Sequence, residues 1–325
     1  MKFFKSFLFS LIAVLFLAAC SEDEVKTPEV TDDNIQEEAA QSNYPKTFTD
    51  GRGKEITFTE KPTNIVSTTL AVDEFLADLT ATENIAAVTQ MSTDASISNI
   101  AGKTDAIATK FETVTAEQIL ALNPGLVIIP SYVSPDVLNQ IEEAGIQTFQ
   151  LVDDSSFEGI LDTIKVLGGI LGEEEAAQAL IADFNKRIAT LEEKTAASAP
   201  TRVLYYTEYL SSITDNTTIG KMIQLAGGVN VISEAGIVGD AYPDYPNLSK
   251  EALVELNPEV IFTTAWGVTE GAPAFVTEWK NDPALSEVAA IKNNKVFVLD
   301  GANVTTASHY VIEGAEEMYS VLSQN

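Results

Sequence analysis

The order of hydrophobic and polar positions predicts strands that alternate with helices along most of the chain. Short apolar runs bounded by turn residues are typical of buried strands, and they cover 64–69, 85–90, 125–129, 146–152, 201–207, 259–264 and 295–300. Between them lie stretches with apolar residues at helical spacing, at 72–79, 115–122, 135–145, 156–171, 217–228, 249–256 and 309–322. Strands that alternate with helices pair in parallel and are covered on both faces, so the pattern predicts an α/β fold.

A long amphipathic segment divides this pattern into two halves. Its apolar residues recur at helical spacing, at Ala177, Leu180, Ile181, Phe184, Ile188 and Leu191. A helix of about 22 residues is about 33 Å long. We therefore expect residues 173–195 to connect an N-terminal lobe, residues 45–172, with a C-terminal lobe, residues 196–325. The first lobe opens with alternating Thr and Phe around the turn sequence DGRG at 50–53, which predicts a β-hairpin.

The two halves share a repeated unit, which reads TAEQILALNPGLVII in the first and SKEALVELNPEVIFT in the second. The copies begin at Thr115 and Ser249, 134 positions apart. Each begins with a residue that favours the helix N-cap and has an Asn-Pro pair where the helix should end. Asparagine tolerates the left-handed conformation and proline cannot extend a helix, so each copy predicts a helix, a turn and a strand.

The N-terminus has the features of an export signal. Lys2 and Lys5 precede about a dozen apolar residues, a run shorter than the roughly 20 that a membrane-spanning helix needs. Residues 1–19 are therefore predicted to be a signal peptide. The sequence LAAC that ends at Cys20 resembles the lipobox of bacterial lipoproteins, in which the cysteine thiol is acylated; an ordinary signal peptide is the alternative. Residues 20–44 are acidic and poor in apolar residues, which predicts a disordered, lipidated tether.

Charge and composition exclude several classes of partner and site. The formal net charge is −29 at pH 7, so few basic groups are available to neutralise the phosphates of nucleic acid or of an anionic membrane surface. We expect contact with the membrane only through the lipid anchor. The chain has one cysteine and one histidine, which argues against a site for free zinc or manganese, and no metal site or cofactor of its own is predicted.

Enzyme signatures are missing from the sequence. None of the motifs G-x-S-x-G, H-E-x-x-H and G-x-G-x-x-G occurs. The residues Gly102-Lys103-Thr104 match the end of a phosphate-binding loop, but Ile97 takes the place of its first glycine. The pair Asp153-Asp154 is typical of the residues that precede a helix. We therefore expect a protein that is not an enzyme, and a surface adhesin or scaffold stays open as another class.

Five segments in this order resemble the substrate-binding lipoproteins of ABC importers for ferric siderophores, cobalamin or haem. They are IVSTT and its helix, the first copy of the repeated unit, QLAGGVNV, the second copy, and NNKVFVLD with the last helix. The resemblance implies two Rossmann-like lobes with mostly parallel sheets, joined by one long α-helix, and a ligand held between them. It also implies a monomer that delivers its ligand to a permease dimer with ATPase subunits, at the outer face of a Gram-positive membrane or in a periplasm. Glu117 and Glu251 match the glutamates that dock onto the permease; the alternative is that each stabilises the dipole of its own helix.

Candidate ligand contacts follow from the rule that ligands bind at the carboxyl ends of parallel strands. The loops expected there are rich in aromatic and hydroxyl side chains, which suit a bulky organic complex. Trp266 comes directly after the run EVIFTTA, where a predicted strand should open onto the ligand site, and is the first candidate. The others are Ser67, Met91, Tyr132, Tyr209, Tyr242, Tyr245 and His309. Packing is the alternative for each tyrosine, and a cap or packed side chain is the alternative for the histidine.

The distribution of arginine predicts the charge of the ligand. The three arginines, Arg52, Arg187 and Arg202, lie outside these loops, although Lys103, Lys110 and Lys221 could contribute. Anionic chelates and haem propionates call for such basic groups, so we expect a neutral iron(III)-siderophore complex of the hydroxamate type. Cobalamin or another corrinoid is the alternative. Haem is less favoured, because Lys110 stands where many haem-binding relatives have a ligating tyrosine.

Overall fold

The computed structural model describes residues 44–154, 156–264 and 273–324. Two predicted site residues, Cys20 and Trp266, lie outside the described residues, as do the predicted signal peptide and nearly all of the tether. None of the helices in the described part of the chain is both long and apolar enough to cross a membrane.

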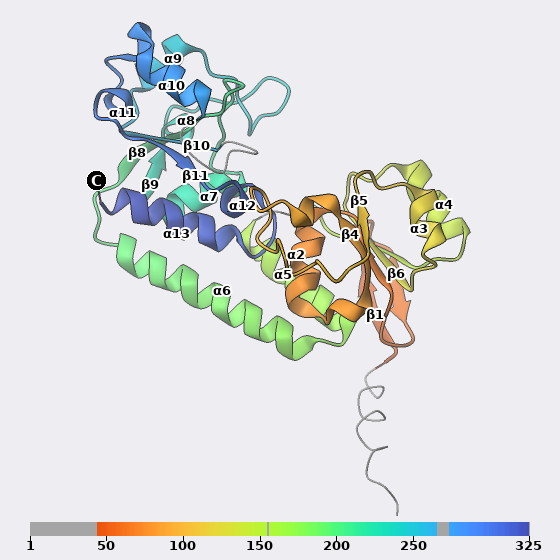
Figure 1. Cartoon of the computed structure of the whole chain (residues 1–325). Helices are drawn as coiled ribbons and strands as arrows, with labels where there is room; N and C mark the ends of the chain where they lie inside the picture. The colour runs from red at the N-terminus through yellow and green to blue at the C-terminus, as the bar shows by residue number, and fades with distance from the viewer. Residues whose placement is uncertain (1–43, 155, 265–272, 325) are drawn as a thin grey trace, which may run out of the picture. The chain divides into compact units, whose positions relative to one another are not determined.

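The first half of the described chain forms a hairpin and a five-stranded sheet with its helices (Figure 1). Strands β1 and β2 pair in antiparallel fashion, which confirms the predicted hairpin. The elements are β1 Lys46–Thr49, β2 Glu55–Phe58, β3 Ile65–Ser67, α2 Leu70–Leu79, η2 Thr82–Asn84, β4 Ile85–Thr89, η3 Gln90–Thr93, β5 Thr109–Phe111, α3 Ala116–Ala121, β6 Leu126–Ile129, α4 Pro135–Glu143, β7 Thr148–Gln150 and α5 Phe157–Leu171.

The second half forms a four-stranded sheet with its helices. It begins after the long helix α6, which runs from Glu174 to Thr195. Its elements are β8 Thr201–Tyr205, α7 Thr218–Leu225, β9 Gly228–Asn230, α8 Val231–Glu234, α9 Lys250–Leu256, β10 Val260–Thr264, α10 Ala274–Asn281, η4 Pro283–Leu285, α11 Ala289–Lys292, β11 Val296–Leu299, α12 Gly301–Thr305 and α13 Val311–Leu322.

The strand order of each sheet places its first strand in the interior. The first sheet runs β5-β4-β3-β6-β7 and the second runs β11-β10-β8-β9, with every pair parallel. In a doubly wound sheet of this kind the chain turns in opposite directions on either side of its first strand, which leaves a crevice at the carboxyl ends of the strands. In the first sheet this switch lies between β3 and β6. The predicted α/β class with two parallel sheets and a long helix is confirmed.

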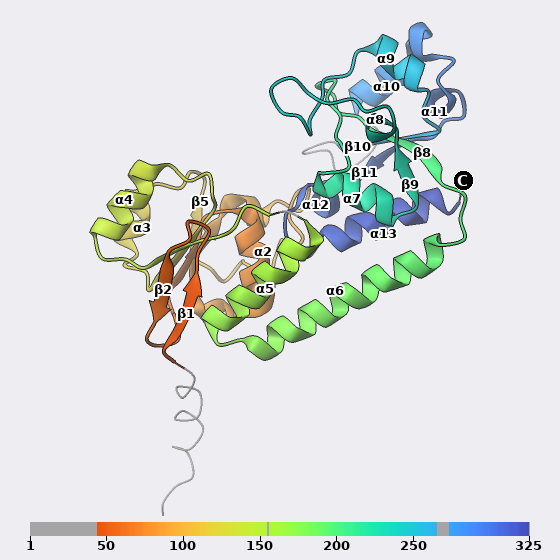
Figure 2. The ribbon, with the colours of Figure 1, turned by 180° about the vertical axis from the view of Figure 1, so that it is seen from behind.

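Helix α6 packs against elements of both halves. Its fully buried residues Ala177, Phe184 and Leu191 are seven positions apart and therefore lie on one face. The Phe184 ring meets Phe157 of α5 edge-on at 5.8 Å, and Arg187 forms an ion pair with Glu316 of α13. Figures 1 and 2 show α6 alongside both α5 and α13. The division of the chain into domains at these boundaries stays a prediction.

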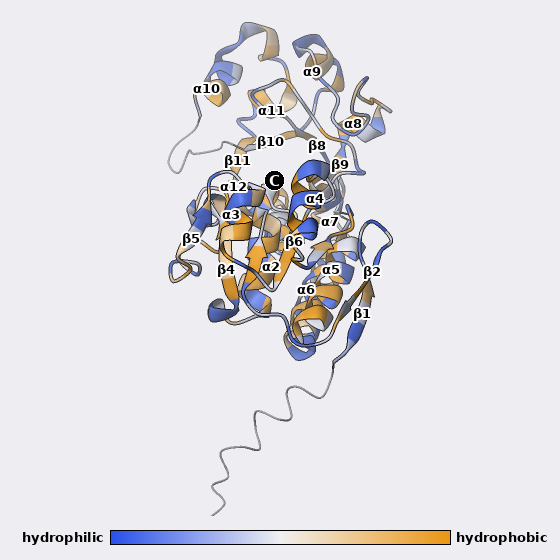
Figure 3. Cartoon of the chain, turned by 90° about the vertical axis from the view of Figure 1, so that its right-hand side faces the viewer, coloured by the Kyte–Doolittle hydropathy of each residue, from blue (hydrophilic) through white to orange (hydrophobic). Residues whose placement is uncertain are grey.

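Apolar side chains fill the space between each sheet and its helices. Strands β4 and β6 are coloured as hydrophobic in Figure 3, and all four residues of β6 are fully buried. A strand that is buried on both faces has a continuous apolar run, which explains why the sequence pattern located these strands well. Two three-residue strands, β5 and β9, were missed because their sequences, TKF and GVN, contain no such run.

Candidate ligand-binding site

A pocket of about 400 Å³ lies at the carboxyl ends of all five strands of the first sheet. Each strand is followed by residues that line it. They are Thr68 to Ala71 after β3, Thr89 and Met91 at the end of β4, Phe111 and Glu112 at the end of β5, Pro130 to Tyr132 after β6, and Leu151 to Asp154 after β7. This is the crevice that the switch in strand order predicts.

The second half of the chain contributes one wall of the same pocket. This wall consists of Thr305, the last residue of α12, and of Thr306 and Ala307, which follow it. The rest of the described lining comes from the first half. Phe75 of α2 and Ile160 of α5 add apolar surface. The pocket therefore depends on the contact between the two halves, and its volume is within the range typical of small-molecule sites.

The lining is apolar with many hydroxyl groups and no basic side chain among the described residues. Its charged members are Glu112, Asp153 and Asp154, all acidic. The first turn of α2, capped by the Thr69 side chain through Val72 N, also reaches the pocket. A helix N-terminus carries a partial positive charge, which attracts oxygen groups of a ligand, anionic ones included. The side chains of the described lining include three acidic groups and no basic one, and they therefore favour a ligand without net negative charge.

A buried carboxyl group supports the pocket floor. Asp73 on α2 is completely buried and accepts hydrogen bonds from Thr89 N at 3.2 Å and Thr89 Oγ1 at 2.5 Å. Burial raises the pKa of Asp73 to about 7, because desolvation disfavours the carboxylate more than these hydrogen bonds stabilise it. Since Thr89 lines the pocket, Asp73 fixes part of the floor.

Two of the predicted ligand contacts line this pocket. Met91 is 41% exposed and Tyr132 is 78% exposed, so both side chains are accessible. Ser67 lies at the end of β3 but is completely buried, and its Oγ donates to Thr69 O at 3.1 Å. Ser67 therefore does not line the pocket itself, but it contacts Thr69, which does.

Three predicted contacts lie together on loops of the second half. Tyr209, Tyr242 and Tyr245 are 80%, 73% and 57% exposed and do not line the 400 Å³ pocket. Backbone hydrogen bonds join their two loops, from Leu248 N to Leu210 O at 2.7 Å and from Ser212 N to Pro246 O at 2.9 Å. Tyr209 follows the carboxyl end of β8, as expected, and Tyr242 and Tyr245 lie between α8 and α9. Whether the three contact a ligand stays a prediction.

The remaining predicted residues occupy two different settings. His309 is nearly buried and does not line the pocket. Its Nε2 lies 3.1 Å from Asp78 Oδ2, and its ring packs at a tilt against the rings of Phe75 and Tyr310. This packed position agrees with the alternative that the sequence left open. Glu117 and Glu251 lie exposed in the first turns of α3 and α9, the equivalent helices of the repeated unit. Among the described residues, no cluster of His, Cys, Asp and Glu is arranged to hold a metal ion.

Sequence reasoning missed most of the lining for identifiable reasons. Phe111 and Glu112 follow β5, which the pattern did not predict. Leu151 to Asp154 follow β7, and the rule about strand ends would have included them. Phe75, Ile160 and Thr163 are helical residues, and only the packing of α2 and α5 beside the sheet brings them to the pocket.

Comparison with known proteins decides the family. The model of the family described as periplasmic binding protein matches residues 65–302, which include both sheets and the long helix. The chain belongs to this family. It is 26% identical over 313 residues to YvrC of Bacillus subtilis, an ABC transporter substrate-binding lipoprotein, and the match covers 95% of this chain and 93% of YvrC.

A second relative and a solved structure agree with this membership. The cobalamin-binding protein of Halobacterium salinarum is 25% identical over 263 residues, 78% of this chain and 70% of that protein. The structure of the periplasmic heme-binding protein RhuT from Roseiflexus superposes with a TM-score of 0.66 and 23% identity, and the superposition covers 80% of this chain and 99% of RhuT. At that identity RhuT establishes the fold alone. The chain therefore has the two-lobed fold of the periplasmic binding proteins.

Proposed function

We propose that this chain is the extracytoplasmic, lipid-anchored substrate-binding protein of an ABC importer and captures an organic metal chelate that carries no negative charge. The observation that carries the proposal is the pocket at the carboxyl ends of β3 to β7, whose described lining has hydroxyl, apolar and acidic groups but no basic ones. An anionic chelate would lose its hydration there without gaining a cationic partner, which is unfavourable.

A ferric hydroxamate is the first candidate ligand. Hydroxamates can neutralise iron(III) completely, so the complex presents an apolar body with polar oxygens to its host. Ser131 and Thr163 offer hydroxyl donors, and Phe75 and Phe111 offer apolar surface. The acidic groups Asp153 and Asp154 at the same pocket would also accept a ligand with a cationic substituent.

A corrinoid is the second candidate, and one specific observation favours it. The similarity to the cobalamin-binding protein of H. salinarum extends over 78% of this chain. A corrinoid is large and has amide side chains that hydroxyl groups can bind, so it too needs no basic lining. Haem is disfavoured because its propionates normally pair with arginine or lysine.

The family and the N-terminal sequence support the proposed anchor and partners. Cys20 ends a lipobox-like LAAC, and the similar YvrC is a lipoprotein. Acylation at Cys20 would hold the folded chain at the outer face of the membrane, close to a permease dimer with its ATPase subunits. Glu117 and Glu251 would dock on that permease, one from each half of the chain.

A titration with a ligand panel tests the proposal. The full chain carrying Cys20→Ser is titrated with ferric hydroxamate, ferric catecholate, ferric citrate, cobalamin and haem, and binding is followed by the fluorescence of Trp266 and Trp279. We expect a dissociation constant below about 1 µM for the hydroxamate or for cobalamin. Binding to none of the five would favour the adhesin or scaffold class, and chemical turnover of a bound ligand would favour an enzyme.

A further inference from the structure

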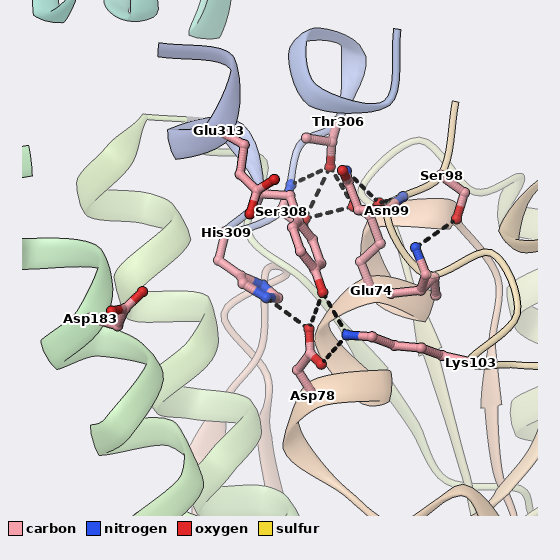
Figure 4. Close-up of polar contacts among 12 residues, drawn as sticks. Glu74, Asp78, Ser98, Asn99, Lys103, Asp183, Thr306, Ser308, His309 and Glu313 are labelled. Carbon is pink, nitrogen blue, oxygen red and sulfur yellow. Dashed lines mark hydrogen bonds and ion pairs between the residues drawn. The ribbon is translucent and has the colours of Figure 1, made fainter. Parts of the chain in front are cut away.

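Helix α2 carries two carboxyl groups, one turn apart, that contact the same segment of the second half. Glu74 and Asp78 are four positions apart and therefore lie on the same side of the helix. Their partners in the second half lie between Thr306 and Tyr310, more than 230 positions away in the sequence. Figure 4 shows both carboxyl groups directed toward this segment.

Glu74 joins the two halves with one side chain. Its Oε1 accepts hydrogen bonds from Asn99 N and Asn99 Nδ2, both at 3.1 Å. Its Oε2 accepts from Thr306 Oγ1 at 2.5 Å and from Ser308 Oγ at 2.6 Å. One oxygen is thus held by the first half and the other by the second. We call Glu74, Asn99, Thr306 and Ser308 the Glu74 clasp.

The burial of Glu74 makes this arrangement sensitive to lobe movement. Its exposed fraction is 0%, and its four donors are all uncharged groups. A buried carboxylate without its hydrogen bonds is costly. If the halves move apart, Oε2 loses Thr306 and Ser308 together, and the cost is relieved only when water enters. The clasp therefore favours one spacing of the two halves.

The clasp is also connected to the ligand pocket. Thr306 lines the pocket, and its Oγ1 accepts the backbone N–H of Ser308 at 3.0 Å, which fixes the turn that presents Thr305 to Ala307. Phe75, the next residue of α2 after Glu74, also lines the pocket. The bond from Glu74 to Thr306 therefore sets the position of one pocket wall relative to another.

Asp78 secures the same segment one turn further along α2. Its carboxylate accepts from Tyr310 OH at 2.6 Å and Lys103 Nζ at 2.8 Å, and it lies 3.1 Å from His309 Nε2. Lys103 also donates to Tyr310 OH at 2.8 Å, so this second contact is a closed network. With two attachments on one helix, the segment from Thr306 to Tyr310 is held against rotation as well as separation.

We propose that Glu74 is a positioning residue that holds the Thr305–Ala307 wall in place for ligand binding and keeps the two halves at a fixed spacing without ligand. The first part rests on the proposed function, since it assumes that this pocket binds the ligand. The second part is independent of any ligand. Glu74 does not line the pocket, so its effect on binding is transmitted through Thr306.

The test combines a distance measurement with dissociation kinetics. Spin labels are attached at Glu143→Cys on α4 and Glu278→Cys on α10, two exposed positions in different halves, in the full chain carrying Cys20→Ser. Electron spin resonance then gives the distance distribution between the labels without ligand. The dissociation rate of a neutral ferric trishydroxamate, and of cobalamin, is measured by competition on the unlabelled variants.

Two variants disturb the clasp from opposite sides. Glu74→Gln keeps the size of the side chain but removes its charge, and Ser308→Ala removes one donor from a residue that does not line the pocket. We expect both to broaden the distance distribution and to speed dissociation, by about tenfold for Glu74→Gln. Their combined effect should be smaller than the sum, because they remove the same interaction. The matched control is Glu142→Gln, whose carboxylate bonds only within the first half, to Arg52, Lys54 and Thr148.

The outcomes separate a positioning role from a structural one. Lower thermal stability with wild-type distances and wild-type dissociation would overturn the proposal and make Glu74 a structural residue. If Glu74→Gln does not fold, Ser308→Ala decides by the same two readouts. If the wild-type chain binds neither probe, the proposed function fails, and the distances alone decide whether the clasp fixes the spacing.

Discussion

Asn123 and Asn257 occupy the same place in the two copies of the repeated unit and have the same unusual backbone conformation. Their φ angles are 45° and 43°, in the left-handed region, and each is followed by a proline. The helices before them are capped alike, since Thr115 Oγ1 accepts from Gln118 N and Ser249 Oγ accepts from Ala252 N. The repetition in sequence is thus a repetition of a capped helix, a left-handed turn and a parallel strand.

The two asparagines should respond differently to glycine. Asn257 Oδ1 accepts the backbone N–H of Ala289 at 2.8 Å, whereas Asn123 serves mainly through its backbone, whose carbonyl accepts from Asn64 Nδ2. We expect Asn123→Gly to be within about 0.5 kcal/mol of wild type and Asn257→Gly to cost about 1 kcal/mol. Asn123→Ala should cost about 1 kcal/mol through its left-handed backbone. Urea denaturation measures all three, and equal costs for the two glycine variants would contradict this account.

A methyl group at Gly301 should disturb the contact between the halves. A Cβ there would lie 2.5 Å from the backbone oxygen of Ser96, which belongs to the first half. Because Gly301 begins α12, alanine suits its local conformation, so any cost comes from this contact. We expect Gly301→Ala to lower the free energy of unfolding by about 1–3 kcal/mol and to weaken ligand binding. A variant with wild-type stability and affinity would show that the backbone at Ser96 moves away from the added methyl group at no cost in free energy.

Asp73 should make stability fall as the pH rises toward neutrality. Its folded pKa of about 7 lies above its ordinary value of 3.8, so between these values the folded chain binds more protons than the unfolded chain. The contribution of Asp73 to stability is therefore complete below about pH 4 and is lost as the pH rises through about 7. Glu142 behaves in the opposite way, because hydrogen bonds lower its pKa to about 2 despite its partial burial. Its contribution to stability is therefore present above its ordinary pKa of 4.5 and does not fall as the pH rises to neutrality. The free energy of unfolding, measured between about pH 4.5 and about pH 7.5, should change less in Asp73→Asn; an unaltered slope would exclude Asp73 as its source.

Replacing Glu117 and Glu251 should separate transport from binding. Both are exposed and neither lines the pocket, so Glu117→Ala and Glu251→Ala should keep wild-type ligand affinity. Import into cells should fall at least about tenfold for the double variant, since charged pairs set the register and rate of docking. Glu143→Ala, a change at another exposed helical glutamate, is the control and should import normally. Loss of affinity in step with import would refute the docking role.

The sequence predicted most of the fold because its strands are buried on both faces. Runs such as LVII in β6 and VIFTT in β10 have no polar alternation, and the caps and Asn-Pro turns define the helices between them. The rule about strand ends then located the loops that hold Met91 and Tyr132. Each of these features depends on residues that are neighbours in the sequence, so the sequence pattern is enough to predict it.

The parts that the sequence did not predict depend on contacts between distant residues. By its sequence Glu74 is an ordinary polar residue of an amphipathic helix, and only its distant partners Asn99, Thr306 and Ser308 account for its complete burial. His309 was open as a ligand contact because nothing in its neighbourhood in the sequence indicates Asp78. The strand β5 is three residues long and is defined by pairing with β4 rather than by its own composition.

Two iron chelates that differ in net charge test most directly whether the pocket selects a ligand without negative charge. The affinities of a neutral ferric trishydroxamate and an anionic ferric catecholate are measured calorimetrically on the wild-type chain and on Thr163→Lys, which places a cation in the pocket lining. The account predicts that wild type binds the neutral chelate at least about a hundredfold more tightly and that the lysine narrows this ratio. Equal or tighter binding of the catecholate by the wild-type chain would contradict it.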